Sequence, residues 1–242
     1  MSSALISASY LSIMEARSAD DFRDQIVRFA EELGFSYVSA LTVVDHSPTR
    51  SDFISIDNMP GDFREAGASQ ADNQRRDPVM QHLKRGAVPL VWDQATYLRQ
   101  GAVDLWEEQA AFGYRTGIAL ALHLPEGRHF MLGVDRDQTL PRDASALTRM
   151  VADLQLFAVH AQDTALRLFV PPEQLVETPS LTPRELESLR WTMEGKTAWE
   201  LGSILGISER TAVLHIQNAM RKLGSVSKHQ AVLKALRLGL IH

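Results

Sequence analysis

The segment that decides the fold is Leu181–Leu223, which reads LTPRELESLRWTMEGKTAWELGSILGISERTAVLHIQNAMRKL. It contains two helical patterns, Thr197–Leu205 and Glu209–Leu223, separated by the short break Gly206-Ile207-Ser208. Gly206 supplies backbone freedom just past the end of the first helix, and Ser208 offers a hydroxyl to the free amides of the second. The segment therefore predicts a helix, a tight turn and a second helix.

The second of these helices has two contrasting faces. At about 100° per residue its apolar positions form one stripe, which we expect to be buried. The opposite face carries groups that can donate to phosphates, hydrogen-bond base edges or touch a thymine methyl. Such a helix fits the major groove of DNA, although a solvated amphipathic helix shows a similar pattern. The apolar stripe is Ala212, Ile216, Ala219 and Leu223, and the polar face is Arg210, Leu214, Gln217 and Arg221 with Asn218 beside them.

The residues around this pattern are more specific than the faces themselves. Leu181–Leu186 is a capping box with proline at the first helical position. The later landmarks are Gly195-Lys196-Thr197, Glu200, Ile207-Ser208-Glu209, Thr211, His215 and Lys222-Leu223. In order and spacing this segment, about a quarter of the chain, resembles the LuxR/FixJ-type DNA-binding domain. The resemblance implies contacts to double-stranded DNA from Thr197, Arg210, Thr211, Leu214, Gln217, Asn218, Arg221 and Lys222.

Two positions depart from the usual pattern of that domain. Ala212 stands where valine is usual, and Val213 stands where many members carry lysine. Because each phosphate contact steepens the salt dependence of binding by about one unit, we expect either weaker binding or binding that rests more on Arg210, Arg221 and Lys222.

The amino-acid composition excludes some kinds of site and favours others. The 242 residues include no cysteine, so disulfide bonds and thiolate metal sites are excluded. The formal net charge of −5 is unevenly distributed: residues 181–242 carry +4 and the rest of the chain −9. Such an asymmetry is expected when only the small C-terminal part meets DNA.

The start of the chain has no basic region before its apolar residues, and no run of about 18 apolar residues occurs anywhere. We therefore expect a cytoplasmic protein with no membrane partner. The eight histidines show no HxH or HExxH spacing, and neither a GxSxG elbow nor a phosphate-binding loop is present. We expect no enzyme activity, no cofactor and no metal site.

The order of expected elements predicts an α+β chain. Residues 1–169 are expected to form an α-β-α sandwich, because helices and β-rich segments alternate along an antiparallel pattern. Residues 170–180 hold three prolines and are expected to be a linker, followed by an all-α helix-turn-helix domain at 181–242. The expected helices are 5–14, 19–33, 77–83, 104–112 and 143–169, with a polar, helical stretch up to residue 73, and the expected strands are 35–44, 53–56, 117–124 and 129–134.

The last expected helix, Lys228–Leu238, has more apolar surface than a small helical domain needs. Its apolar residues either pack in the core of that domain or form a contact with a second copy of the chain.

The N-terminal part shows a weaker resemblance. Its landmarks are Pro60-Gly61-Asp62-Phe63, Asp77-Pro78-Val79, Pro89–Trp92, Leu105–Glu108 and Gly113–Gly117. They are similar to those of the autoinducer-binding domain of LuxR-type quorum-sensing regulators, which buries an N-acyl-homoserine lactone between sheet and helices. The resemblance implies four ligand-binding positions, Phe63, Asp77, Trp106 and Gly117.

The resemblance gives three of these positions a specific role. Asp77 matches the aspartate that accepts the ligand amide, but Asp followed by Pro78 is also a good helix start. Trp106 matches the tryptophan that packs on the lactone ring and is also suited to a core. Gly117 matches a glycine where a larger side chain would enter the pocket.

Two family anchors are missing. Phe63 stands where the family has a tryptophan that donates to the lactone carbonyl, and Gly67 replaces a tyrosine. Losing such hydrogen bonds costs roughly 1–3 kcal/mol each, so we expect an altered ligand specificity. Residues nearby that either substitute for the lost anchors or are simply exposed are Gln70, Asn73, Arg75 and Arg76.

Together the two resemblances predict a ligand-responsive transcriptional regulator of the LuxR type, sensing an acyl-homoserine lactone or a related small molecule. We expect a homodimer on a palindromic promoter site, with RNA polymerase as a further partner. The alternative is a ligand-independent or dominant-negative LuxR-like protein that pairs with another regulator and blocks it.

Overall fold

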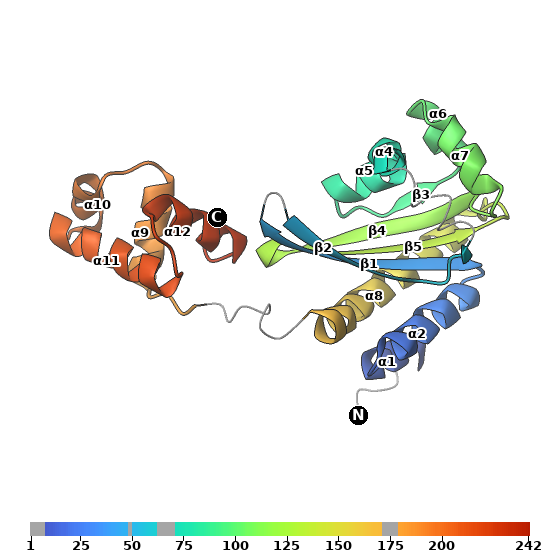
Figure 1. Ribbon diagram of the computed structural model, residues 1–242, viewed down its shortest axis with the longest axis horizontal. Coiled ribbons are helices and arrows are strands. Elements are labelled where there is room, and N and C mark those ends of the chain that lie inside the picture. The colour runs from blue at the N-terminus through green and yellow to red at the C-terminus, as the bar shows by residue number, and fades with distance from the viewer. Residues whose placement is uncertain (1–7, 48–49, 62–70, 171–178) are drawn as a thin grey trace. The chain divides into compact units, whose positions relative to one another are not determined.

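The computed structural model describes residues 8–47, 50–61, 71–170 and 179–242 (Figure 1). The chain divides into two compact units, passing from the first to the second after residue 174. Each unit has its own hydrophobic core.

The first unit is built on one five-stranded sheet, with the strand order β2-β1-β5-β4-β3 and antiparallel pairing throughout. The strands are β1 (Tyr37–Ser47), β2 (Arg50–Asp57), β3 (Leu90–Trp92), β4 (Thr116–Leu124) and β5 (Arg128–Arg136), and the 3₁₀ turn Pro125–Gly127 joins the last two. The helices of this unit are α1 (Ala8–Glu15), α2 (Ala19–Glu32), α4 (Ala71–Arg76), α5 (Pro78–Arg85), α6 (Gln94–Arg99), α7 (Val103–Ala110) and α8 (Ala144–Phe169).

Helices cover both faces of the sheet. Figure 1 shows α1, α2 and α8 on one face and α4, α5, α6 and α7 on the other. Because side chains alternate along a strand, the central strands β1, β4 and β5 supply both cores. Ile118 and Leu120 of β4 face the core under α2 and α8, whereas Ala119 and Ala121 face the core under α5 and α7.

The first core is held by aromatic packing between helices. The rings of Phe29 in α2 and Phe157 in α8 are stacked with centroids 3.8 Å apart. Ser18 caps α2 and Asp143 caps α8, each accepting a hydrogen bond from a backbone amide three residues on. The paired caps and rings fix both helices against the sheet.

The predicted α+β class and α-β-α layering of this unit are confirmed. Several local predictions were incomplete, and β1 and β2 are also longer than the strands expected at 35–44 and 53–56. The strand at Leu90–Trp92 and the helix at Gln94–Arg99 were not predicted, because each is too short to show a period. Strand β5 extends past the predicted end at Val134 to Arg136, since Asp135 interrupts the apolar pattern but not the pairing. Most of the polar stretch expected up to residue 73 lies outside the described residues.

The second unit contains α9 (Pro183–Met193), α10 (Ala198–Leu205), α11 (Glu209–Lys222) and α12 (Lys228–Arg237). Side-chain caps begin all four helices, and Thr182 and Thr197 form capping boxes with glutamates. Gly206 ends α10 in the left-handed conformation at φ 66°. The predicted stripe of α11 is buried at Ala212, Ala219 and Leu223, so the helix-turn-helix pattern is confirmed.

None of the helices in the described ranges is long and apolar enough to cross a membrane.

Candidate ligand site and DNA-binding surface

The candidate ligand site lies on the sheet face that α5, α6 and α7 cover. We define it by six residues: Asp77, Trp92, Tyr97, Gln109, Gly117 and Asp135. Its central residue is Asp77, which caps α5 by accepting hydrogen bonds from the amides of Val79 (2.8 Å) and Met80 (3.3 Å). The interpretation of Asp77 as the N-terminal cap of a helix is therefore correct.

Asp77 also ties α5 to two neighbouring helices. The Tyr97 hydroxyl of α6 lies 3.4 Å from Asp77 Oδ1 and 3.0 Å from Gln109 Oε1. The Gln109 amide of α7 donates to Asp77 Oδ2 at 3.4 Å. Three helices thus converge on one carboxylate. The longer of these contacts leave Asp77 with acceptor capacity for a further donor.

Burial determines how the polar groups of this network titrate. Desolvation raises the pKa of Asp77, although the amides of Val79 and Met80 oppose the shift. Desolvation, together with the charges of Asp77 and Asp135, raises the pKa of Tyr97, so its hydroxyl stays protonated at neutral pH. The tyrosine is therefore a hydrogen-bond donor to this network.

Gly117 marks a close approach of two polar side chains. A Cβ atom at Gly117 would lie 2.5 Å from Asp135 Oδ1, 2.6 Å from Trp92 Nε1 and 2.6 Å from the Val134 carbonyl. Because one neighbour is backbone, only glycine fits here without displacing β5. The carboxylate of Asp135 and the indole N–H of Trp92 therefore converge over the same point of the sheet.

Asp135 is a buried carboxylate. Its exposed fraction is 8%, and no described side chain forms a hydrogen bond or ion pair with it. Desolvation raises its pKa to about 8, with a smaller contribution from the charge of Asp77. Burying an unpaired carboxylate is costly, so the group is mainly neutral at pH 7 when nothing is bound.

The other predicted ligand residues have different outcomes. Trp106 of α7 is half-buried beside the second core and donates its indole N–H to the Arg115 carbonyl at 3.0 Å. Phe63, Gly67 and Gln70 lie outside the described residues. Arg76 forms an exposed ion pair with Asp104 (2.9 Å), and Arg75 is exposed, so neither arginine supplies a described contact to the candidate ligand site.

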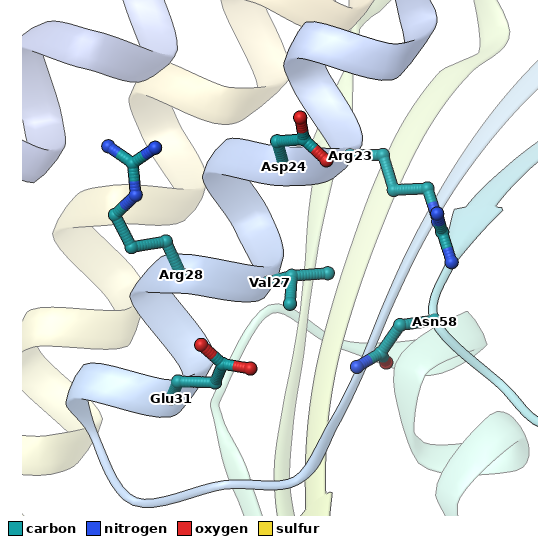
Figure 2. Close-up of a pocket in the computed structure, with 6 residues that line it drawn as sticks. All are labelled: Arg23, Asp24, Val27, Arg28, Glu31 and Asn58. Atoms are coloured by element: carbon teal, nitrogen blue, oxygen red, sulfur yellow. The ribbon is translucent and has the colours of Figure 1, made fainter.

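An open depression of about 310 Å³ lies elsewhere in the first unit. Figure 2 shows that α2 supplies most of its lining and that Asn58 follows β2. Arg23 donates to the Asp57 carbonyl at 2.9 Å, and Asn58 bonds the backbone of Val38 and Ser36. These polar groups hold the end of β2, so we assign the depression no ligand.

The surface of α11 carries most of the predicted DNA contacts. Arg210, Gln217 and Arg221 are exposed, and Leu214 has an exposed fraction of 52%. Arg221 donates to Asn218 Oδ1 at 3.1 Å, which orders both side chains on the same face. This face therefore presents two cations, two amides and an apolar side chain together.

The two predicted threonines have capping roles. Thr197 begins α10 and exchanges hydrogen bonds with Glu200. Thr211 lies with its hydroxyl 2.8 Å from that of Ser208, the cap of α11. Their contacts with DNA stay predictions.

Lys222 has a structural partner. Its Nζ donates to Glu185 Oε2 at 2.8 Å and to the Ser180 carbonyl at 3.1 Å. Burial alone would raise the pKa of Glu185, but hydrogen bonds from Lys222 and Thr182 outweigh it and the pKa is lowered. The geometry therefore favours a role for Lys222 in holding α11 to α9 over the predicted contact with DNA.

Five residues of this account were not identified from the sequence. Trp92 was read only as a landmark, and Tyr97 and Gln109 lie in short helices without a distinctive spacing. An aspartate in an otherwise apolar strand was the available signal for Asp135. Gly202 packs against the turn, where a Cβ atom would lie 2.9 Å from the Ile207 carbonyl.

Similarity to known proteins agrees with this geometry. Residues 18–165 match the family model described as "Autoinducer binding domain", and residues 179–235 match "Bacterial regulatory proteins, luxR family". The first match alone spans more than half of the chain. The chain belongs to the LuxR family of bacterial transcriptional regulators, which are not enzymes.

Two of the LuxR-family relatives cover nearly the whole chain and a third covers about two thirds of it. The transcriptional activator protein AnoR of Acinetobacter nosocomialis is 31% identical over 93% of this chain and 94% of its own length. AhyR of Aeromonas hydrophila, also a transcriptional activator protein, is 28% identical over 92% of this chain and 86% of its own. The quorum sensing-dependent regulator RpaR of Rhodopseudomonas palustris is 36% identical over 68% of this chain and 66% of its own.

Solved structures give the same result. The crystal structure of Escherichia coli SdiA covers 96% of this chain and 95% of its own, with 29% identity and a TM-score of 0.66. SdiA in complex with octanoyl-rac-glycerol matches with a TM-score of 0.63 and 28% identity, covering 96% of this chain and 93% of its own.

We predict that Lys222→Met destabilises the second unit by about 1–3 kcal/mol, because Glu185 is buried and would lose its cation. Arg184→Met is the matched control. It breaks the exposed Arg184–Glu187 pair and should cost at most about 1 kcal/mol. Chemical denaturation followed by helix signal measures both. Equal effects of the two variants would contradict the structural role of Lys222.

We predict that Asp135→Asn becomes progressively more stable than the parent protein as pH rises from about 5 to about 8. The folded-state pKa of Asp135 is raised to about 8, so the folded state holds a proton that the unfolded state has released. The parent therefore loses stability across this window, by an amount on the order of a few kcal/mol. Thermal midpoints of the two proteins at several pH values measure the difference, and a difference that does not change with pH would contradict the prediction.

Proposed function

We propose that this LuxR-family member binds a small molecule at the candidate ligand site and that binding controls its attachment to promoter DNA. One observation carries the proposal: Asp77 of the autoinducer-binding domain joins α5, α6 and α7 and has acceptor capacity left for a ligand donor. A ligand that binds only the ordered helices raises the population of that state.

We propose further that the ligand differs from a typical acyl-homoserine lactone. Phe63 cannot donate a hydrogen bond, and Asp135 adds a buried carboxylate on the sheet side of the site. A solved complex of SdiA holds octanoyl-rac-glycerol, so a structurally similar protein accepts an acyl compound without a lactone. The family domain itself is consistent with a small-molecule signal such as an N-acyl-homoserine lactone.

The DNA-bound form is proposed to be a homodimer on a palindromic promoter site, with α11 of each copy in a major groove. The exposed leucines of α12, Leu233 at 63% and Leu236 at 40%, support a contact between copies. We propose activation, through RNA polymerase, because AnoR and AhyR are named transcriptional activator proteins.

The second candidate function is a partner that pairs with another regulator and blocks it. It is favoured by the small number of cations available to DNA on α11. Lys222 is engaged with Glu185, and Val213 occupies a position where many members have lysine. This candidate predicts no attachment of the purified protein to any palindromic site.

We predict that Arg221→Ala weakens promoter binding by about tenfold or more and lowers the slope of log affinity against log salt by about one. The reason is that Arg221 is exposed on the predicted groove-facing side of α11. Fluorescence anisotropy with a palindromic duplex measures both quantities, with and without the lipid fraction of a bacterial extract.

Arg149→Ala, which removes an exposed arginine from α8 of the first unit, is the charge-matched control and should leave the slope unchanged. Salt-sensitive binding that increases with extract supports the proposed function. Salt-sensitive binding that extract leaves unchanged would overturn the ligand-responsive part, and no binding in either condition favours the blocking partner.

A further inference from the structure

An open depression of about 280 Å³ lies on the surface of the second unit, beside α11. Four of its eight lining residues belong to α11, and the others come from α9, α10, α12 and the connection between α9 and α10. Two of the lining residues are lysines and none is acidic. The depression therefore combines a side of the predicted recognition helix with cations from other elements.

The depression flanks the exposed face of α11. Val213 and Met220 are half-buried and lie, at about 100° per residue, between that face and the buried stripe of the helix. Gln217, which belongs to the exposed face, forms the edge of the depression. An α-helix is about 10–12 Å across with its side chains, and the major groove is about 12 Å wide. When α11 lies in the groove, its flank therefore meets the backbone of one DNA strand.

The two lysines of the depression differ from the other lysines of the second unit. Residues 179–242 contain four lysines, of which Lys222 and Lys234 use their amino groups in hydrogen bonds that hold the helices together. Lys196 and Lys228 both line the depression. In the described parts of the chain, no ion pair or side-chain hydrogen bond engages either of them.

The charge of Lys196 is only partly offset by a neighbouring acid. The pKa of the Glu200 carboxyl is lowered mainly by hydrogen bonds from Thr197, with a smaller contribution from the charge of Lys196. The carboxylate of Glu200 thus already has its partner, 2.8 Å from Thr197 Oγ1. The ammonium groups of Lys196 and Lys228 are available to an anion that comes from outside the protein.

The size and lining of the depression favour a polymer that passes across it. Sites that enclose a small molecule usually measure about 300–1,000 Å³ and bury most of the ligand, whereas this depression is smaller and open. A nucleic-acid backbone carries anionic phosphates and, between them, the apolar faces of its sugars. The net charge of +4 on residues 181–242 also favours DNA over a neutral partner.

We propose that one strand of the duplex crosses this depression, with its phosphates bound by Lys196 and Lys228 and a deoxyribose resting on Val213 and Met220. The inference rests on the proposed attachment to DNA and adds contacts from outside α11. The motif resemblance assigned neither lysine to DNA. Together they supply the positive charge that α11 lacks on this side, where Val213 stands in place of the lysine of many family members.

The full-length variants Lys196→Met and Lys228→Met test the proposed contacts. Each should lower the slope of log affinity against log salt by about one and weaken binding about three- to tenfold, and the double variant should lower the slope by about two. Because phosphate contacts carry no sequence information, the loss should be the same on a palindromic duplex and on a scrambled duplex of equal composition. Fluorescence anisotropy measures all of these quantities. Unchanged slopes in both single variants would overturn the inference.

Two controls separate a lost contact from a change in fold or in net charge. Arg184→Met removes a cation that is already paired with Glu187 within α9, and it should leave the slope unchanged. Arginine in place of Lys196 and Lys228 keeps both charges, so it should preserve the slope. Because neither lysine has a partner in the described parts of the chain, the methionine variants should keep the thermal midpoint within about 3 °C. Equal losses of slope in Arg184→Met and the lysine variants would overturn the inference.

Neutral phosphates test whether both lysines contact the same strand. A methylphosphonate removes the charge of one phosphate, and it is introduced at one position of each half-site at a time. At the phosphate bound by Lys196, the substitution should weaken the parent protein about three- to tenfold and leave Lys196→Met unaffected. Lys228→Met should show the same behaviour at another phosphate of that strand. Coupled phosphates on opposite strands, or no coupled phosphate, would overturn the inference.

A small amphipathic anion is the other occupant that fits this chemistry, and octanoate serves as its probe. If octanoate binds the parent at least about tenfold more tightly than the double lysine variant, while both have the same salt slope on DNA, the inference is overturned. If the parent binds DNA and Arg221→Ala weakens it but the lysine variants do not, only this inference fails. If the parent shows no salt-sensitive binding to either duplex, the proposed attachment to DNA fails and the inference fails with it.

Discussion

The first unit depends on a single carboxylate that holds three short helices over a sheet. Asp77 caps α5 through two amides and receives donors from α6 and α7. Helices of six to eight residues are marginal on their own, so their position over β4 relies on this network and on the buried Trp92 and Tyr97. A group that binds at Asp77 therefore acts on all three helices together.

On the sheet side of the same site, close packing requires a glycine at position 117. The side chains of Asp135 and Trp92 converge on Gly117, and a single methyl group at Gly117 would collide with both side chains and with the backbone of β5. The helices on the other face pack through large aromatic rings such as Phe29 and Phe157. One face of the sheet is thus a well-packed core, whereas the other brings polar groups together in a buried setting. Buried polar side chains gathered in this way are more characteristic of a binding site than of a hydrophobic core.

The long, capped or strongly periodic elements could be predicted from the sequence. The α11 stripe and the capping box that begins α9 depend only on local chemistry, and both agree with the structure. Trp92, Gln109 and Asp135 could not be identified in this way, because their role depends on which strand and helix lie beside them. For Lys222 the motif predicts a contact with DNA. The structure shows instead a hydrogen bond to Glu185, which lies 37 positions away in the sequence, so local chemistry could not reveal this partner.

The measurement that tests the central claim most directly is hydrogen–deuterium exchange of the full chain, with and without the lipid fraction of a bacterial extract. If a ligand is held between β4, β5 and the helices α5 to α7, exchange should slow in residues 78–110 and at β4 and β5, with α1 and α2 unchanged. Slower exchange confined to other segments, in a sample where a small molecule is retained, would contradict the placement of the site around Asp77.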